Sequence, residues 1–143
     1  MQPVNENIAN LSITSQTKNL TFVREYVSSA AKNVGFDELT IDNIIIAVDE
    51  ACTNIIKHAY KNNPDNPIDV SITFDNNKFN IILKDKGKSF DPNTIPSPNM
   101  NEYFKQYKVG GLGIHLMKTL MDEVVYHSKP NEYNQIVLSK KLP

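Results

Sequence analysis

Two alternating segments joined by a short turn place the strongest constraint on the fold of this chain. "IDVSITF", residues 68–74, alternates apolar and polar side chains, which is typical of a strand with one buried face. "FNIILK", residues 79–84, follows after "DNNK", and asparagine tolerates the positive φ that a tight turn requires. The pattern predicts an antiparallel hairpin whose apolar face has to be covered by a second layer.

Three further segments have the apolar spacing of helices that can supply this layer. The first spans residues 17–35, with Thr17 as a candidate cap and Gly35 as a fitting stop. The second is capped by Asp37 or Thr40 and ends near Tyr60, and the third covers residues 112–121. Strands are expected at "NIANLSITS" and, around the turn "KPNEYN", at "EVVYHS" and "QIVLSK".

The order of these elements is strand, two helices, hairpin, long loop, helix and hairpin. It predicts an α+β fold, a two-layer α/β sandwich whose mixed sheet is mostly antiparallel and carries its helices on one face. We expect residues 1–143 to form a single domain. The loop from Asp85 to Gly110 has no sustained period, and loops of this length often serve as lids or binding segments.

Composition excludes several function classes. The net charge of −1 gives no field that would draw nucleic acid or anionic lipid, so we expect neither as a partner. Cys52 is the single cysteine and cannot form an internal disulfide. No apolar run has the length of a membrane span, and the start "MQPVNENIAN" lacks the pattern of a signal peptide. We expect a cytoplasmic protein.

A row of three polar residues interrupts the second helix, in "VDEACTNIIKHAY". Glu50, Asn54 and Lys57 fall within an arc of about 60° at 3.6 residues per turn. A carboxylate can act as a general base, an amide oxygen can ligate magnesium, and an ammonium can neutralise phosphate. A solvated helix face would have the same spacing, so this stretch alone leaves both interpretations open.

Two other stretches could carry chemistry. In "DKGKSFDP", Asp85 could accept a hydrogen bond from an amino group, and Gly87 would let a flat ring approach the backbone. In "VGGLGIHLM", three glycines precede a helix and free backbone N–H groups for an anion. Taken singly, the first is an ordinary Asp-Gly turn and the second a weak signal.

Together, in this order and spacing, the three stretches resemble the GHKL (Bergerat-fold) ATP-binding superfamily, which includes gyrase and the sensor histidine kinases. Within it, "DEACTNIIKHAY", "DKGKSFDP" and "GGLGIHLMKTLMDEVVY" look most like the bacterial anti-sigma-factor serine/threonine kinases. The resemblance covers nearly the whole chain and implies an α/β sandwich. It also implies ATP and Mg²⁺ as cofactors.

The resemblance implies a role for each matching residue. Glu50 matches the catalytic base, Asn54 the magnesium ligand, and Lys57 a basic position that faces the phosphates. Asp85 matches the aspartate that recognises the adenine amino group, with Gly87 beside the ring. The glycines of the lid and phosphate site correspond to Gly110, Gly111 and Gly113.

The chain departs from the family pattern at two places. Ser89 stands where the first aspartate loop usually carries a second glycine. Tyr133 and Asn134 stand where the last strand is usually entered through Gly-Thr, whose hydroxyl helps to hold adenine. Asn134 can still hydrogen-bond, so the resemblance still implies that it helps to bind the nucleotide.

The leading hypothesis is a kinase that transfers the γ-phosphoryl group of ATP to a serine or threonine of a protein antagonist and sequesters a sigma factor. Relatives self-associate, so a homodimer is expected. The alternative is a catalytically silent module that binds ATP or ADP and sequesters a protein partner. A histidine-kinase fragment is a weaker hypothesis, because no helical phosphoacceptor hairpin precedes the domain.

Overall fold

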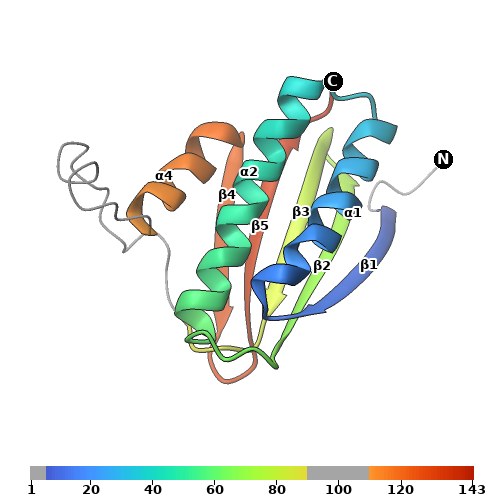
Figure 1. Cartoon of the computed structure of the whole chain (residues 1–143). Helices are drawn as coiled ribbons and strands as arrows, with labels where there is room; N and C mark the ends of the chain where they lie inside the picture. Colours follow the sequence, from blue (N-terminus) through green and yellow to red (C-terminus); the bar gives the residue numbers. More distant parts are fainter. Residues whose placement is uncertain (1–5, 90–109) are drawn as a thin grey trace.

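The computed structural model describes residues 6–89 and 110–143. In chain order its elements are β1 (Glu6–Thr14), η1 (Thr17–Asn19), α1 (Leu20–Asn33), α2 (Glu38–Asn54), η2 (Ile55–Ala59), β2 (Pro67–Asp75), β3 (Lys78–Asp85), α4 (Gly110–Leu120), β4 (Glu123–Lys129) and β5 (Tyr133–Lys141). Figure 1 shows α1, α2 and α4 lying across one face of the sheet. No described helix is long and apolar enough to cross a membrane.

The five strands form one sheet in the order β1-β2-β3-β5-β4. Each pair of neighbours in the described part of the chain is antiparallel, so the α+β sandwich is confirmed, but the sheet is not mixed. Asn76 and Asn77 form the tight turn between β2 and β3, with φ of 46° and 63°. This is the left-handed backbone predicted for the "DNNK" turn.

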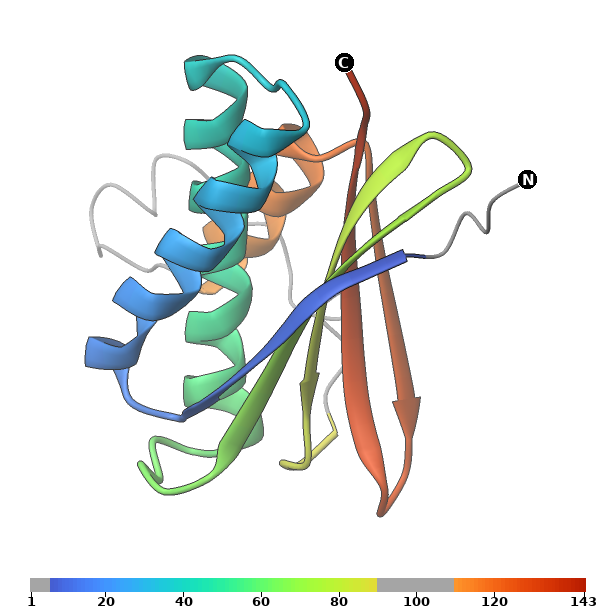
Figure 2. The ribbon, with the colours of Figure 1, turned by 90° about the vertical axis from the view of Figure 1, so that its right-hand side faces the viewer.

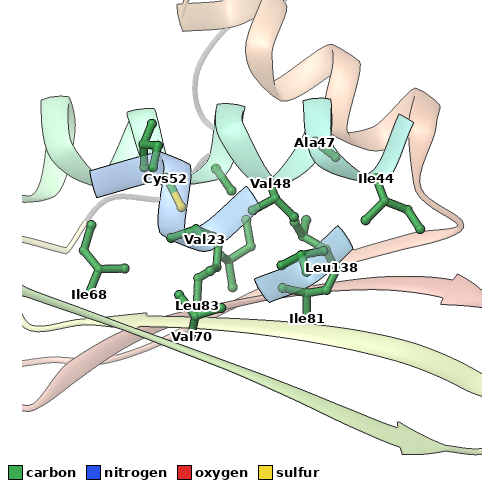
Figure 3. Close-up of a cluster of buried hydrophobic side chains, with 14 of the residues drawn as sticks. Val23, Ile44, Ala47, Val48, Cys52, Ile68, Val70, Ile81, Leu83 and Leu138 are labelled. Carbon is green, nitrogen blue, oxygen red and sulfur yellow. The ribbon is translucent and has the colours of Figure 1, made fainter. Parts of the chain in front are cut away.

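The core lies between the sheet and the helices, which Figure 2 shows edge-on as two layers. Valine and isoleucine side chains from α1 and α2 meet those of the central strands in Figure 3, among them Val23, Val48, Val70 and Ile81, each at most 1% exposed. Cys52 lies in the same cluster and is fully buried. Burial of this kind contributes about 25 cal/mol per Å² of apolar surface, so this layer contact is the main source of stability.

The second helix, α2, is buried on two sides. Asp37 caps it, accepting a hydrogen bond from the Thr40 N–H at 2.9 Å, which decides between the two predicted caps. Beyond the side that faces the sheet, Ile44, Ala47 and Ala51 are also buried, and α4 packs alongside α2. The helix then passes into η2, a π-helical turn, instead of continuing regularly to Tyr60. Part of its polar row is therefore enclosed.

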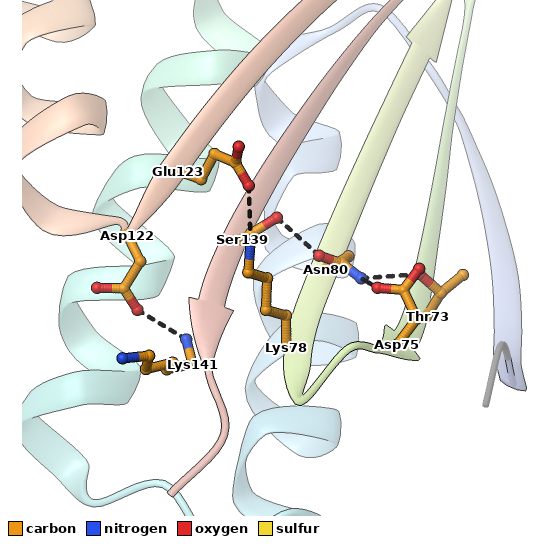
Figure 4. A network of polar contacts seen from close by, with 8 residues as sticks. All are labelled: Thr73, Asp75, Lys78, Asn80, Asp122, Glu123, Ser139 and Lys141. Atoms are coloured by element: carbon orange, nitrogen blue, oxygen red, sulfur yellow. Dashed lines mark hydrogen bonds and ion pairs between the residues drawn. The ribbon is translucent and has the colours of Figure 1, made fainter.

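The face of the sheet that points away from the helices carries a polar network beside the apolar side chains of Ile82, Val125 and Val137. In Figure 4, Ser139 donates to Asn80 at 2.7 Å, and Asn80 donates to Asp75 at 2.8 Å. Lys78 forms an ion pair with Glu123 at 2.9 Å across the same face. These contacts hold neighbouring strands in register while leaving the face compatible with water.

Two local predictions differ from the structure. Thr17 does not cap α1, because it is the first residue of the short 3-10 turn η1. The last strand begins at Tyr133, two residues before the predicted "QIVLSK", because Tyr133 pairs with Lys129 of β4 and Asn134 pairs with Asp85 of β3. The predicted loop of residues 85–110 lies mostly outside the described residues.

Candidate functional site

Three polar side chains lie side by side on neighbouring strands, at the end of the sheet where the apolar core stops. Asp85 of β3 is paired with Asn134 of β5, and Asn134 is paired in turn with Ser128 of β4. Two residues further into the sheet on each strand, the side chain on the same face is apolar or aromatic: Leu83, Ile136 and Tyr126. The strand register therefore places a polar row across three strands at the edge of the core.

Asp85 is held in one orientation although it is only 4% exposed. Its Oδ1 accepts a hydrogen bond from the Gly87 N–H at 2.8 Å and another from Asn134 Nδ2 at 2.9 Å. Burial raises the pKa of this carboxyl above its ordinary value, while these two hydrogen bonds act in the opposite direction. Both donors reach the same oxygen, so Oδ2 receives no hydrogen bond from the described part of the chain.

Asn134 joins the aspartate loop to the last hairpin. Its Nδ2 also donates to the Gly87 carbonyl at 3.0 Å, so both amide hydrogens have acceptors. Its Oδ1 lies 2.8 Å from Ser89 Oγ, 2.9 Å from Ser128 Oγ and 3.3 Å from the Tyr126 hydroxyl, all of which can donate. Asn134 is 1% exposed, and its hydrogen-bonding capacity is filled by the protein.

Gly87 lacks a side chain because the backbone of η2 occupies the space. A Cβ at this position would lie 2.5 Å from the Ala59 carbonyl oxygen. The adjacent Lys88 N–H donates to that same oxygen at 2.8 Å. Tyr60 holds the loop from the other side, since its hydroxyl accepts from the Lys86 N–H at 2.7 Å and donates to the Pro67 carbonyl. The loop after β3 is thus fixed against the end of the second helix.

Asn54, at the end of α2, shares a cavity with Asp85. The enclosed volume is about 10 Å³, and the lining comes from α2, η2, α4 and the last three strands, at Ala51, Asn54, Ile55, Asp85, Met117, Tyr126, Gln135 and Ile136. Asn54 is 4% exposed, and its Nδ2 has no hydrogen-bond partner in the described structure. Buried amide groups are nearly always paired, so this one is an expected contact for a ligand.

Glu50 and Lys57 lie outside that cavity. Glu50 is partly buried, and desolvation followed by the charge of Asp49 raises its pKa, while the charge of Lys57 lowers it. Asp49 itself is paired with Arg24 of α1 at 2.9 Å. Lys57 is exposed on η2. The predicted row therefore divides into a buried amide, a partly buried carboxyl and a solvated ammonium.

The predicted site residues come together to different degrees. Asp85, Gly87 and Asn134 form one hydrogen-bonded unit, with Asn54 across the cavity. Gly110, Gly111 and Gly113 lie within the first turn of α4 instead of preceding that helix. Sequence reasoning missed Ser128, Tyr126 and Tyr60, although the two-residue period of β4 does place Tyr126 and Ser128 on one face.

A comparison with known protein families shows to which family this fold and its candidate site belong. A family model described as "Histidine kinase-like ATPase domain" matches residues 13–140, which include all three candidate stretches. The chain belongs to the histidine kinase-like ATPase family. The fold and the superfamily expected from the motifs are confirmed.

Within the histidine kinase-like ATPase family, the chain is similar to proteins named "Serine-protein kinase RsbW". It is 31% identical to the one from Bacillus subtilis, over 84% of this chain and 78% of that protein. It is 34% identical to one from Listeria monocytogenes, over 80% and 75%, and 33% identical to one from Staphylococcus aureus, over 87% and 82%.

Among solved structures, the chain is similar to the RsbU and RsbW domains of Rv1364c from Mycobacterium tuberculosis. The TM-score is 0.63 at 16% identity, and the similarity covers 94% of this chain. The chain spans 32% of that longer protein. At this level of identity the similarity shows the histidine kinase-like ATPase fold alone.

Proposed function

We propose that this protein binds ATP with Mg²⁺, phosphorylates a serine or threonine of a protein antagonist, and sequesters a sigma factor that this antagonist releases. The observation that carries the proposal is the cavity that Asp85 and Asn54 both line, because it brings to one site a buried carboxyl group and a buried amide whose Nδ2 has no partner among the described residues. The relatives named as serine-protein kinases support the choice of reaction.

In this proposal Asp85 recognises the base. Its Oδ1 is engaged by Gly87 and Asn134, which leaves Oδ2 to accept a hydrogen bond from the exocyclic amino group of adenine. The cavity as it stands has room for about one water molecule, so the lining has to open for a purine. Met117, on α4, is the lining side chain best suited to make way, because methionine is unbranched and has three rotatable bonds.

Asn54 fits the magnesium–phosphate group by its chemistry. An amide oxygen is a hard ligand of the kind Mg²⁺ takes, and the unpaired Nδ2 would donate to a phosphate oxygen. When bound, the ion neutralises the charge that develops on the phosphoryl group. Lys57 adds a positive charge one turn further along, and the first turn of α4 presents backbone N–H groups to the phosphates.

Glu50 is the proposed general base, which accepts the proton of the attacking hydroxyl. Its raised pKa suits this role, because a stronger base at neutral pH abstracts a proton more readily. The partly buried position keeps the carboxylate within reach of a protein substrate at the surface of α2. Its neighbour Asp49 is held in an ion pair with Arg24.

The test is labelled-phosphate transfer onto a candidate antagonist and its serine-to-alanine variants. Glu50→Gln retains shape and hydrogen bonding but removes the proton acceptor, so transfer falls by about 10²–10⁴-fold while ATP affinity changes little. Asn54→Ala is expected to lower magnesium-dependent nucleotide binding and transfer together. Asp42→Asn, an exposed carboxylate elsewhere on α2, is the matched control.

Two outcomes would contradict the proposal. A protein that gives no calorimetric heat with millimolar Mg-ATP is not a nucleotide-binding protein. A protein that binds ATP but labels no serine or threonine on its cognate antagonist is the silent binding module instead. Protein contacts occupy both amide hydrogens of Asn134, so in either function Asn134 acts on the base through Asp85.

A further inference from the structure

The two positions at which the chain departs from the family pattern are in direct contact. Ser89 follows the aspartate loop and Asn134 lies in β5, yet the serine hydroxyl donates to Asn134 Oδ1 at 2.8 Å. Ser128 and Tyr126 of β4 point at the same oxygen. We call Ser89, Ser128 and Tyr126 the hydroxyl cluster. Its shared target is the oxygen end of one buried amide.

An asparagine needs such a cluster in a way that a threonine does not. The oxygen and nitrogen ends of an amide have nearly the same shape, and only their hydrogen bonds distinguish them. Here the nitrogen end faces two acceptors, Asp85 Oδ1 and the Gly87 carbonyl. A rotated amide would place its oxygen against both acceptors and withdraw a donor from the carboxylate. The hydroxyl cluster opposes that rotation because it supplies hydrogens to the oxygen end.

The hydrogens of the cluster match the acceptor sites they meet. Ser89 Oγ and Ser128 Oγ also lie 2.7 Å from each other, and either can be the donor. If one serine donates to the other, the second hydrogen goes to Asn134 Oδ1, and the Tyr126 hydroxyl supplies another. An amide oxygen has two lone pairs, so both can be filled. Loss of one serine leaves a donor in place, whereas after loss of both the one remaining donor among the described residues is the Tyr126 hydroxyl at 3.3 Å.

We propose that Ser89 and Ser128 are positioning residues that orient Asn134 and, through it, the base-recognising carboxylate of Asp85, so that the departures at 89 and 134 compensate for one another. This inference rests on the proposed function, because its consequence is selectivity for a base with an exocyclic amino group. In this proposal Ser89 supplies a hydrogen that the amide oxygen of an asparagine at 134 needs. A threonine at 134 has a single hydroxyl, so it lacks the second amide orientation of nearly the same shape that the hydroxyl cluster has to exclude.

Calorimetry with Mg-ATP and Mg-ITP tests this coupling, since the inosine base carries an oxo group where adenine carries its amino group. The double variant Ser89→Ala/Ser128→Ala is expected to bind ATP about tenfold more weakly and ITP unchanged, because the acceptor for the amino group is no longer fixed. Adding Asn134→Thr restores the preference for ATP. The control is Ser29→Ala/Ser71→Ala, which removes two hydroxyls from α1 and β2.

The coupling between Asn134 and the two serines is measured by introducing Asn134→Thr into the wild type and into the double variant. Asn134→Thr is expected to weaken ATP binding in the wild-type chain and to strengthen it in the double variant. Equal effects in both backgrounds would show that the positions act independently and would overturn the inference. An unchanged ATP to ITP ratio in Ser89→Ala/Ser128→Ala would also overturn it, while leaving nucleotide binding by the wild type intact.

A second measurement needs no nucleotide. Hydrogen exchange of the Asn134 side-chain amide, assigned by its absence from the Asn134→Thr spectrum, reports whether both hydrogens stay engaged. Protection is expected in the wild type and in the control, and its loss in Ser89→Ala/Ser128→Ala. Equal protection in all three would refute the positioning role. If the wild type binds no ATP, the proposed function fails, and this exchange still decides whether the cluster orients Asn134.

Discussion

Replacing Gly87 by alanine tests how tightly the aspartate loop is held against η2. The new Cβ would lie 2.5 Å from the Ala59 carbonyl oxygen, 2.6 Å from its carbon and 2.8 Å from its Cβ. Two of these atoms are backbone of a packed helical turn, so the loop has to move instead. Restoring an ordinary contact of 3.4 Å requires a shift of about 0.9 Å.

A shift of that size also removes a hydrogen bond. The Lys88 N–H lies 2.8 Å from the same Ala59 oxygen, and an added 0.9 Å or so brings the pair beyond hydrogen-bonding distance. Overpacking costs about 1–3 kcal/mol and the lost hydrogen bond about 1 kcal/mol. We therefore expect Gly87→Ala to lower the free energy of unfolding by about 2–4 kcal/mol.

Urea unfolding followed by circular dichroism measures this change, with Gly35→Ala as the control. Gly35 has φ of 98°, and no atom of the described residues lies within 4 Å of its Cβ position, so its substitution strains the backbone without a clash among them. It is expected to lower stability but leave nucleotide affinity unchanged, whereas Gly87→Ala lowers both. A Gly87→Ala protein with the wild-type urea midpoint would refute the reasoning.

The other predictions concern groups in different parts of the fold. Asp85→Asn is expected to weaken ATP binding by roughly 1–3 kcal/mol. Burial raises the pKa of Asp85, so the folded state holds this proton more tightly than the unfolded state does. The stability that the proton contributes is complete below the unfolded pKa of about 3.8 and is lost as the pH rises through the folded pKa. The urea midpoint of Asp85→Asn should therefore rise relative to that of the wild type between pH 4 and pH 7. Burial raises the pKa of Cys52 to about 12, so a thiol reagent should label it only as fast as the protein opens, and rapid labelling under native conditions would contradict its burial. Light scattering should report twice the 16.2 kDa mass of the chain, because the edge strands β1 and β4 leave backbone groups that a second subunit can cover. A monomer at micromolar concentration would count against the dimer.

The parts of the fold that were predictable from the sequence are those set by local patterns. The hairpin of β2 and β3 follows from alternation and from two asparagines that accept positive φ. The cap at Asp37 follows from side-chain chemistry within one turn of a helix. These features need only residues that are near one another in the sequence, so periodicity and capping rules are sufficient.

The parts that escaped prediction depend on contacts between distant segments. Asn54 belongs to a row with the spacing of a solvated helix face, yet it is buried because α4 packs beside α2. The hydroxyl cluster depends on the registers of β3, β4 and β5, which no local pattern fixes. The family resemblance pointed to Asp85 and Asn134 as site residues, but their direct hydrogen bond required the strand pairing.

The pairing of Asp85 with Asn134 also implies a delay during synthesis, between the appearance of the first residue and that of its partner. The two residues are 49 positions apart, and a ribosome adds about 5–20 residues per second, so Asp85 is made roughly 2–10 s before its partner. During that interval β3 presents an unpaired edge, because β5 is its second neighbour in the sheet. Until β5 is made, Asp85 also lacks its hydrogen bond from Asn134. The nascent β2–β3 hairpin therefore stays exposed to misassembly until β5 has been synthesised.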